Sequence, residues 1–347
     1  MAKPRNLIVL WTTGRCNLKC KYCYAGGTSI HADMEFETAK KVLDYFGKEP
    51  MKVQFAGGEP MLNFDLIRKV YKYVRERGYD GSFQMQTNGT LIDSKKEKEI
   101  KEMNMAIGIS LDGVPEVNEH LRGKTKEVIH GIQALCQEGM MVNINSVVTA
   151  QNVEQIPKLA DFAFYLGNIG GIGLDLLRQA GRMKESSCQV KKASPSQLES
   201  ALSSLQQRCN FWYQHSGRKI GVREVEEART RLKHSLSNEN YCYASCGRSF
   251  VVLPNGDIYP CGSLIDKPNL YMGNLQFEDK IRSISLPKQD RKLCINCKYI
   301  AICPGGCPSR LIVNRNTSEE VLDCVMKKTA FEIAQEELSS NRKEVQI

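Results

Sequence analysis

The feature that most restricts the fold is an alternation of short apolar runs with amphipathic segments over the first two-thirds of the chain. The apolar runs are rich in Val and Ile and nearly continuous, as in parallel strands buried on both faces. The expected strands are Leu7–Thr12, Val53–Ala56, Ser82–Gln86, Ala106–Leu111, Val142–Val148 and Ile172–Leu177. The expected helices are Phe36–Phe46, Phe64–Arg77, Ser94–Met103, Glu127–Glu138, Val153–Tyr165 and Pro195–His215.

Six β–α repeats imply parallel strands joined by right-handed crossovers. Because eight repeats are needed to close a barrel, a partial (β/α)6 barrel of the TIM type is the more economical α/β fold. A doubly wound open sheet is the alternative. The Rossmann fingerprint is absent, because Gly170-Gly171-Ile172-Gly173 precedes an expected strand rather than following one.

Three cysteines, Cys16, Cys20 and Cys23, form a C-x3-C-x2-C loop after the first expected strand. A structural zinc site needs a fourth ligand and prefers two separate C-x2-C arms. A disulfide framework does not suit an odd number of cysteines in a chain without an export signal. Three thiolates can instead hold a cubane iron–sulfur cluster and leave one iron open for chemistry.

Small and polar residues follow the other expected strands, where an α/β fold places its ligand groups. Each group is also typical of a turn, but their common position on one rim favours a binding site. In chain order they are Gly57-Gly58-Glu59-Pro60, Thr87-Asn88-Gly89, Ser110-Leu111-Asp112-Gly113, Asn145 with Ser146, and Leu176-Leu177-Arg178.

Eight of the fourteen cysteines lie between Cys242 and Cys324. In a chain without an export signal this density indicates metal sites or clusters rather than disulfides. A pair of structural zinc sites is the alternative, since the C-x2-C at Cys294 and Cys297 would permit one. The same region contains two expected strands, Phe250–Leu253 and Ile258–Pro260, joined by a hairpin turn at Asn255-Gly256.

No targeting or membrane segment is evident. Only five apolar residues run together before Thr12, and no later run approaches the roughly 18 that a spanning helix needs. We therefore expect a cytoplasmic protein that does not enter a membrane. The net charge of +9 is scattered, and its densest runs, Lys95–Lys101 and Arg218–Arg231, interleave Glu as solvated helix faces do. Nucleic-acid binding is therefore not expected.

The three-cysteine loop, with the aromatic Tyr22 before its last cysteine, resembles the signature of the radical S-adenosylmethionine (SAM) enzymes. The stretch Gly57–Pro60 strengthens the resemblance, which covers residues 5–215 together with the β–α units. It implies that SAM chelates the open iron of a [4Fe-4S] cluster held by Cys16, Cys20 and Cys23. One electron from the cluster then cleaves SAM to methionine and a 5′-deoxyadenosyl radical, which abstracts a hydrogen atom from the substrate.

The resemblance also implies which residues contact SAM. Gly57 and Gly58 would let the backbone approach the methionyl amine, because a side chain there would block it, and Glu59 would help to orient that group. Arg122, in the stretch His120-Leu121-Arg122-Gly123, would pair with the carboxylate; a surface ion pair is the alternative. The full set of implied SAM contacts is Tyr22, Gly57, Gly58, Glu59, Ser110, Asp112, Arg122, Asn145 and Leu176.

The C-terminal cysteines are similar to the SPASM extension of radical SAM enzymes that modify peptides and proteins. The resemblance implies two auxiliary [4Fe-4S] clusters, three clusters in all. Cluster I is assigned Cys242, Cys246, Cys261 and Cys307, and cluster II is assigned Cys294, Cys297, Cys303 and Cys324. Cys307 lies among the cluster II cysteines in the sequence but is assigned to cluster I. In two-cluster ferredoxins a cysteine that is followed by Pro, as Cys307 is by Pro308, likewise serves the other cluster.

These patterns divide the chain into a radical SAM partial barrel (1–215), a charged bridging segment (216–241), a SPASM domain (242–330) and a C-terminal helix end and tail (331–347). Residues Glu319–Ser340 are expected to form a helix. Cys136 and Cys209 are interpreted as buried small side chains. Cys188 is interpreted as an exposed thiol, with hydrogen-atom donation to a substrate radical as the alternative.

Two functions of different type follow. The first is modification of a peptide or protein by cross-linking, oxidation or epimerisation, with a separate leader-peptide-binding protein and an electron donor such as flavodoxin or ferredoxin as partners. The second is decarboxylation or dehydrogenation of a small molecule in cofactor, sugar or tetrapyrrole metabolism. Sulfatase maturation is not expected, because Gly262 follows Cys261 where that group has an Asp. A pure electron-transfer protein would have no use for an open iron.

Overall fold

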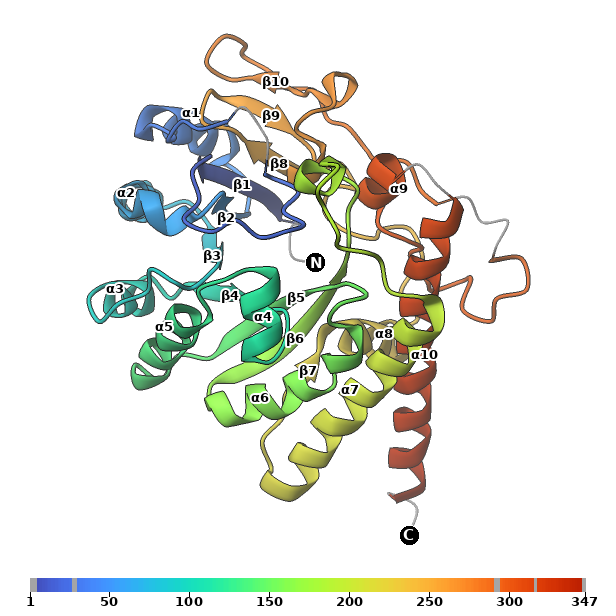
Figure 1. Ribbon diagram of the computed structural model, residues 1–347. Helices are drawn as coiled ribbons and strands as arrows, with labels where there is room; N and C mark the ends of the chain where they lie inside the picture. The colour runs from blue at the N-terminus through green and yellow to red at the C-terminus, as the bar shows by residue number, and fades with distance from the viewer. Residues whose placement is uncertain (1–4, 27–29, 290–293, 315–316, 345–347) are drawn as a thin grey trace.

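A computed structural model of the chain describes residues 5–26, 30–289, 294–314 and 317–344 (Figure 1). The last residues of the expected tail, 345–347, lie outside the described residues. One ten-stranded sheet organises the molecule, in the order β10-β9-β8-β1-β2-β3-β4-β5-β6-β7. Its strands are β1 (Asn6–Thr13), β2 (Met51–Gly57), β3 (Gly81–Thr87), β4 (Ala106–Ser110), β5 (Val142–Val148), β6 (Ile169–Leu176), β7 (Gly221–Val222), β8 (Ser249–Val252), β9 (Asp257–Tyr259) and β10 (Gly273–Asn274).

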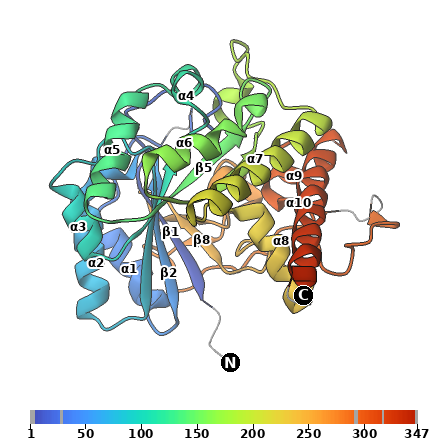
Figure 2. The ribbon, with the colours of Figure 1, turned by 90° about the horizontal axis from the view of Figure 1, so that it is seen from below.

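All neighbouring strands from β8 through β1 to β7 are parallel, and only the β8–β9 and β9–β10 pairs are antiparallel. The strands therefore form an open, partial barrel, and the expected α/β fold class is confirmed. Figure 2 shows the helices arranged around the outside of the curved sheet. They are α1 (Phe36–Phe46), α2 (Phe64–Glu76), α3 (Lys96–Glu102), α4 (Pro115–Leu121), α5 (Thr125–Gln137), α6 (Lys158–Leu166), α7 (Pro195–Ser216), α8 (Arg223–His234), α9 (Pro308–Asn314) and α10 (Thr317–Glu344).

The expected strands and helices are confirmed with small shifts at their ends, and three differences have a local cause. The single helix expected over Val153–Tyr165 is a 3-10 turn, η2 (Val153–Gln155), followed by α6. Pro157 lies at the junction, where its ring restricts the residue before it. Helix α4, which begins with Pro115 at its first position, was not expected. The expected bridge contributes a further β–α unit, β7 and α8, to the barrel.

The inner face of the barrel differs from the expectation of strands that are apolar on both sides. In β2 and β3 the residues facing the helices, such as Phe55 and Met85, are buried and apolar. The alternate positions carry Gln54, Gln84 and Gln86, which are half-buried. A strand has a two-residue period, so the apolar set faces the helices and the carboxamides face inward. The interior of this barrel is therefore polar along β2 and β3.

The C-terminal region continues the same sheet rather than standing apart from it. Strand β8 pairs in parallel with β1, with Leu7 opposite Ser249, and the expected hairpin turns at Gly256, whose φ is +88°. The chain then returns through α10, which packs along α7 and α8 (Figure 2). The domain boundary expected at residue 330 therefore falls inside one continuous helix.

Candidate active site

A cavity of about 610 Å³ opens at the C-terminal ends of the parallel strands. Its wall combines the three-cysteine loop, the ends of β2 to β6, the start of α8 and the cysteine-rich C-terminal region. Of the residues implied to contact SAM, it is lined by Tyr22, Gly57, Gly58, Ser110, Arg122, Asn145 and Leu176. The predicted rim of strand ends is thus one continuous surface.

Cys16, Cys20 and Cys23 all line this cavity. The backbone of their loop is held from two sides. The Lys21 amide donates to the Leu121 carbonyl at 3.0 Å, and the Arg182 guanidinium donates to the Cys20 carbonyl at 3.0 Å. Burial raises the pKa of the Cys20 thiol to about 11, while Arg122 acts in the opposite direction. The three thiols are therefore gathered in a partly dry site where a cationic partner favours the thiolate.

Gly57 and Gly58 bring the end of β2 against the cysteine loop. A Cβ on Gly57, whose φ is +133°, would lie 2.4 Å from the Thr13 carbonyl oxygen. A Cβ on Gly58 would lie 2.1 Å from the Arg15 carbonyl oxygen. No side chain fits at such distances from backbone, so both positions require glycine to hold the loop, whatever contact they make with SAM.

The Glu59 side chain is buried and does not itself line the cavity. Its carboxylate accepts hydrogen bonds from the Thr87 hydroxyl at 2.6 Å, the Asn88 amide at 2.8 Å and the Met61 amide at 3.0 Å. Burial raises its pKa to about 7, against these three donors. Glu59 therefore ties the end of β2 to the end of β3. A part of Glu59 in orienting SAM stays a prediction.

Asp112 is fully buried behind the cavity wall, and its carboxylate has internal partners. It forms an ion pair with Arg122, whose Nε lies 2.9 Å from Oδ2, and accepts hydrogen bonds from the Tyr22 hydroxyl and, at 3.0 Å, the Val147 amide. The Arg122 guanidinium also lies over the Tyr22 ring, 5.3 Å from its centre. Arg122 is therefore part of a buried ion pair, and the alternative of a surface pair is wrong. A contact between Arg122 and SAM stays a prediction.

The floor of the cavity is a chain of polar side chains that sequence reasoning only partly found. Gln86 donates to Ser110 at 3.1 Å and accepts from Asn145 at 2.7 Å, and Asn145 in turn accepts from Arg223 at 3.0 Å. Gly108 and Gly173 make room for them, since a Cβ on either would meet these side chains at 2.5 Å. The signal for Gln86 was the two-residue period of polar residues in β3; Arg223 had no local signal.

Three of the four cysteines assigned to cluster I, Cys242, Cys261 and Cys307, line the same cavity. The fourth, Cys246, donates to the Tyr243 carbonyl at 3.3 Å. All four cysteines assigned to cluster II line a second pocket, whose walls include Tyr299 and Phe331: Cys294, Cys297, Cys303 and Cys324. The four cysteines assigned to cluster II thus share one pocket, whereas three of those assigned to cluster I share a cavity with the three-cysteine loop, and the division into two clusters stays a prediction.

Among the described residues, no group of three His, Cys, Asp or Glu side chains is arranged to hold one metal ion. The assignment of these cysteines to clusters rather than to zinc stays a prediction.

The three remaining cysteines lie away from the cavity. Cys188 packs against Met183, 3.5 Å between sulfurs, and its thiol donates to the Lys21 carbonyl at 3.5 Å. Cys209 is buried in α7, and burial raises its pKa to about 12. Cys136 lies 3.5 Å from the position of a Cβ on Gly167. None of the three is among the residues that line the cavity.

A model of the radical SAM superfamily matches residues 12–163. An uncharacterized protein of Methanocaldococcus jannaschii is 33% identical over 305 residues, covering 84% of this chain and 96% of that protein. The chain belongs to the radical SAM superfamily. It is therefore a radical SAM enzyme, and the SAM-binding iron–sulfur cluster of the family comes with that membership.

Two further relatives differ in what they act on. Fe-coproporphyrin III synthase of Methanosarcina barkeri is 36% identical over 170 residues, 46% of this chain and 41% of that protein. A cysteine-type anaerobic sulfatase-maturating enzyme of Clostridium novyi is 24% identical over 366 residues, 95% of each chain. The substrates of these relatives are of different types.

The fold is shared with SPASM-type maturases. The structure of native anSMEcpe with bound AdoMet superposes with a TM-score of 0.81 at 22% identity, covering 99% of this chain and 100% of that one. Streptococcus suis SuiB bound to the precursor peptide SuiA superposes with a TM-score of 0.64 at 20% identity, covering 92% and 75%. No helix in the described part of the chain is long and apolar enough to cross a membrane.

Proposed function

We propose that this radical SAM enzyme modifies a residue of a peptide or protein substrate, by oxidation, cross-linking or epimerisation, using three [4Fe-4S] clusters. One observation carries the proposal. Cys16, Cys20 and Cys23 share a single cavity with Cys242, Cys261 and Cys307. A substrate in that cavity lies between the cluster that cleaves SAM and a second cluster that can take up an electron.

The size of the cavity favours a side chain as the reacting group. Pockets for one drug-sized ligand measure roughly 300–1,000 Å³, and this cavity of about 610 Å³ has to hold SAM as well. The space beside SAM suits a single amino-acid side chain better than a tetrapyrrole. The full-length similarity to a sulfatase-maturating enzyme points the same way.

Two features restrict which of these reactions the cavity can support. Every cysteine among the described residues that line the cavity is assigned to a cluster, so no spare thiol is in place to return a hydrogen atom, as an epimerase needs. Oxidation or cross-linking is therefore favoured over epimerisation. An Asp in place of Gly262 would fit only tightly, because a Cβ there would lie 3.0 Å from the Trp11 ring, which would have to shift by a few tenths of an ångström. This supports a reaction other than sulfatase maturation.

The residue roles belong to this proposal. Cys16, Cys20 and Cys23 hold the catalytic cluster, and the residues on the cavity wall bind SAM directly. Glu59 and Asp112 position that wall. An acidic electron carrier such as flavodoxin or ferredoxin supplies electrons, a separate protein supplies leader-peptide binding, and a cytoplasmic location keeps the fourteen thiols reduced.

The test is anaerobic incubation of the iron-loaded enzyme with SAM and dithionite. Formation of 5′-deoxyadenosine is expected, and its absence would contradict the enzyme assignment. Synthetic peptides encoded by short reading frames beside the gene are then added, and a loss of two mass units is expected. Iron analysis gives about twelve atoms per chain if three four-iron clusters are present; about four would remove both auxiliary clusters.

A small-molecule substrate is the second candidate, because the identity to Fe-coproporphyrin III synthase, 36% over 170 residues, is higher than the 24% to the sulfatase-maturating enzyme. Decarboxylation or dehydrogenation of a tetrapyrrole would then be expected. Incubation with an iron tetrapyrrole that still carries more carboxylate side chains than Fe-coproporphyrin III, as a precursor of that product would, separates the two functions under the same conditions. Turnover of the porphyrin, with no mass change in any peptide, would favour the small-molecule function.

A further inference from the structure

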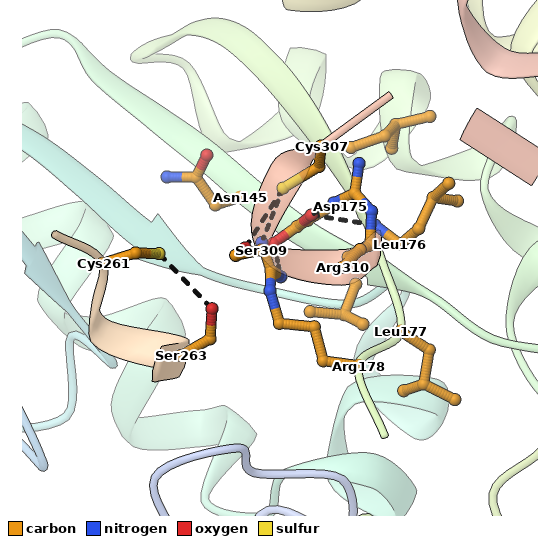
Figure 3. A network of polar contacts seen from close by, with 12 residues as sticks. Asn145, Asp175, Leu176, Leu177, Arg178, Cys261, Ser263, Cys307, Ser309 and Arg310 are labelled. Atoms are coloured by element: carbon orange, nitrogen blue, oxygen red, sulfur yellow. Dashed lines mark hydrogen bonds and ion pairs between the residues drawn. The ribbon is translucent and has the colours of Figure 1, made fainter. Parts of the chain in front are cut away.

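A guanidinium from the barrel reaches one of the ligands assigned to cluster I. Arg178 follows β6 at the rim of the cavity, and its Nη2 lies 3.9 Å from the Cys307 sulfur (Figure 3). The side chain of Arg178 is largely buried. A charged N–H donor at a cysteine sulfur in a partly dry site acts strongly on the charge of that sulfur.

Two serine hydroxyls add to this donor set. The Ser309 hydroxyl oxygen lies 3.2 Å from the Cys307 sulfur, and the Ser263 hydroxyl oxygen lies 3.4 Å from the Cys261 sulfur (Figure 3). Both serines are buried. A cysteine that ligates iron has lost its proton, so each hydroxyl must be the donor. Two of the four assigned ligands therefore receive hydrogen bonds from side chains of this chain.

Carboxylates balance the guanidinium charges nearby. Asp175 pairs with Arg178 and Arg310, and Arg310 pairs also with Asp323. Although burial alone would raise it, the pKa of Asp175 is lowered to about 2 by these two arginines, so the network stays charged. Two positive and two negative groups are present, and Arg178 is the one with a direct hydrogen-bond contact to the Cys307 sulfur.

We propose that Arg178, together with Ser309 and Ser263, raises the reduction potential of cluster I so that this cluster accepts an electron from the substrate radical. Hydrogen bonds to ligand sulfurs and nearby charge are established determinants of cluster potential. The inference rests on the proposed function, because it requires cluster I to be present. Arg178 acts on cluster I indirectly, through its contact with the Cys307 sulfur, and is therefore a positioning residue rather than a catalytic one.

Loss of a hydrogen atom to the adenosyl radical leaves a substrate radical, which would give one electron to oxidised cluster I and one proton to water. The substrate is thereby oxidised by two electrons in all, and the cluster is reduced by one. An external electron-carrier protein whose potential lies above that of cluster I would then take this electron and reoxidise the cluster.

The test measures the midpoint potential of each cluster in the iron-loaded full chain, with electron paramagnetic resonance as the readout. Arg178→Met removes the donor while keeping the length of the side chain, and it should lower one midpoint potential. Asp175→Asn removes the negative charge that pairs with Arg178 and should raise the same midpoint potential. Arg208→Met, which breaks an exposed Arg–Asp pair on α7, is the matched control and should move none.

Opposite shifts of one cluster support the proposal, because a merely structural role would move both variants in the same direction. Unchanged potentials, or shifts of equal sign, overturn it. If Arg178→Met fails to retain cluster I, the midpoint potential of cluster I is measured in Ser309→Ala and Ser263→Ala instead. If neither variant lowers that potential, the proposal is overturned. If the wild-type protein binds only about four iron atoms per chain, the proposed three-cluster function is refuted. If it binds about twelve and the variants leave the midpoint potentials unchanged, this inference alone is refuted.

Discussion

The buried pair between Arg122 and Asp112 is expected to hold the cysteine loop in place. Their side chains are 11% and 0% exposed. Removing one member of such a pair leaves a buried charge without its partner, at a cost of about 3–5 kcal/mol. In Arg122→Leu the lower end of that range applies, because Asp112 keeps the Tyr22 hydroxyl and the Val147 amide as donors.

Hydrogen exchange of the cluster-free protein measures this cost locally. The Lys21 amide, which bonds to the Leu121 carbonyl next to Arg122, reports on opening of the loop. Since each 1.4 kcal/mol is about a factor of ten, 3 kcal/mol corresponds to roughly 100-fold faster exchange of a peptide containing Lys21. Exchange in α1 should not change, because opening there is a separate local event.

Arg208→Leu is the matched control for this prediction. Arg208 also pairs with an aspartate, Asp161, but the two side chains are 48% and 32% exposed. Asp161 likewise keeps another donor, the Trp212 ring nitrogen at 2.7 Å. An exposed pair contributes about 0–1 kcal/mol, so less than about fivefold acceleration near α7 is expected. Equal, small effects of both variants would show that the Arg122–Asp112 pair does not hold the loop.

Three further predictions concern single positions. Gly58→Ala places a Cβ 2.1 Å from the Arg15 carbonyl, so it should displace the cysteine loop and lower bound iron by about four atoms, one cubane, per chain; full iron content would contradict this. Glu59 has its pKa raised from 4.5 to about 7, so the unfolded chain ionises first as pH rises. The stability of the cluster-free protein should fall between those pH values by on the order of 3 kcal/mol. In urea unfolding that slope should be absent from Glu59→Gln, and an equal slope in both proteins would exclude Glu59 as its source. Gly262→Asp should crowd Trp11 and quench or shift its fluorescence without creating sulfatase-maturating activity; such activity would show that only the missing acid had prevented it.

Much of the architecture was predictable because it is local. Nearly continuous apolar runs located the strands and amphipathic segments located the helices, and parallel strands necessarily bring their C-terminal ends to one rim. The cysteine loop and the Gly57-Gly58 pair therefore met as expected. The division of the later cysteines between two sites came from the resemblance, since spacing alone also allowed zinc.

The parts that were not predictable depend on partners far apart in the chain. Nothing near Glu59 shows that Thr87 and Asn88 occupy its carboxylate, or that Arg122 and Tyr22 occupy Asp112. Arg223 enters the cavity floor from a segment that looked like a charged bridge. Such side chains acquire their roles from tertiary packing, which a sequence pattern does not report.

The pairing of β1 with β8 has a consequence for how the protein is made. Strand β1 leads into the cysteine loop, yet one of its edges is covered only when Ser249 and its neighbours reach Leu7. At about 5–20 residues per second, that edge stays open for roughly 10–50 s of synthesis. An apolar open edge is a template for wrong pairing. Nascent or truncated chains ending before β8 should therefore depend on chaperones, and iron delivered to the loop early would meet an unfinished sheet.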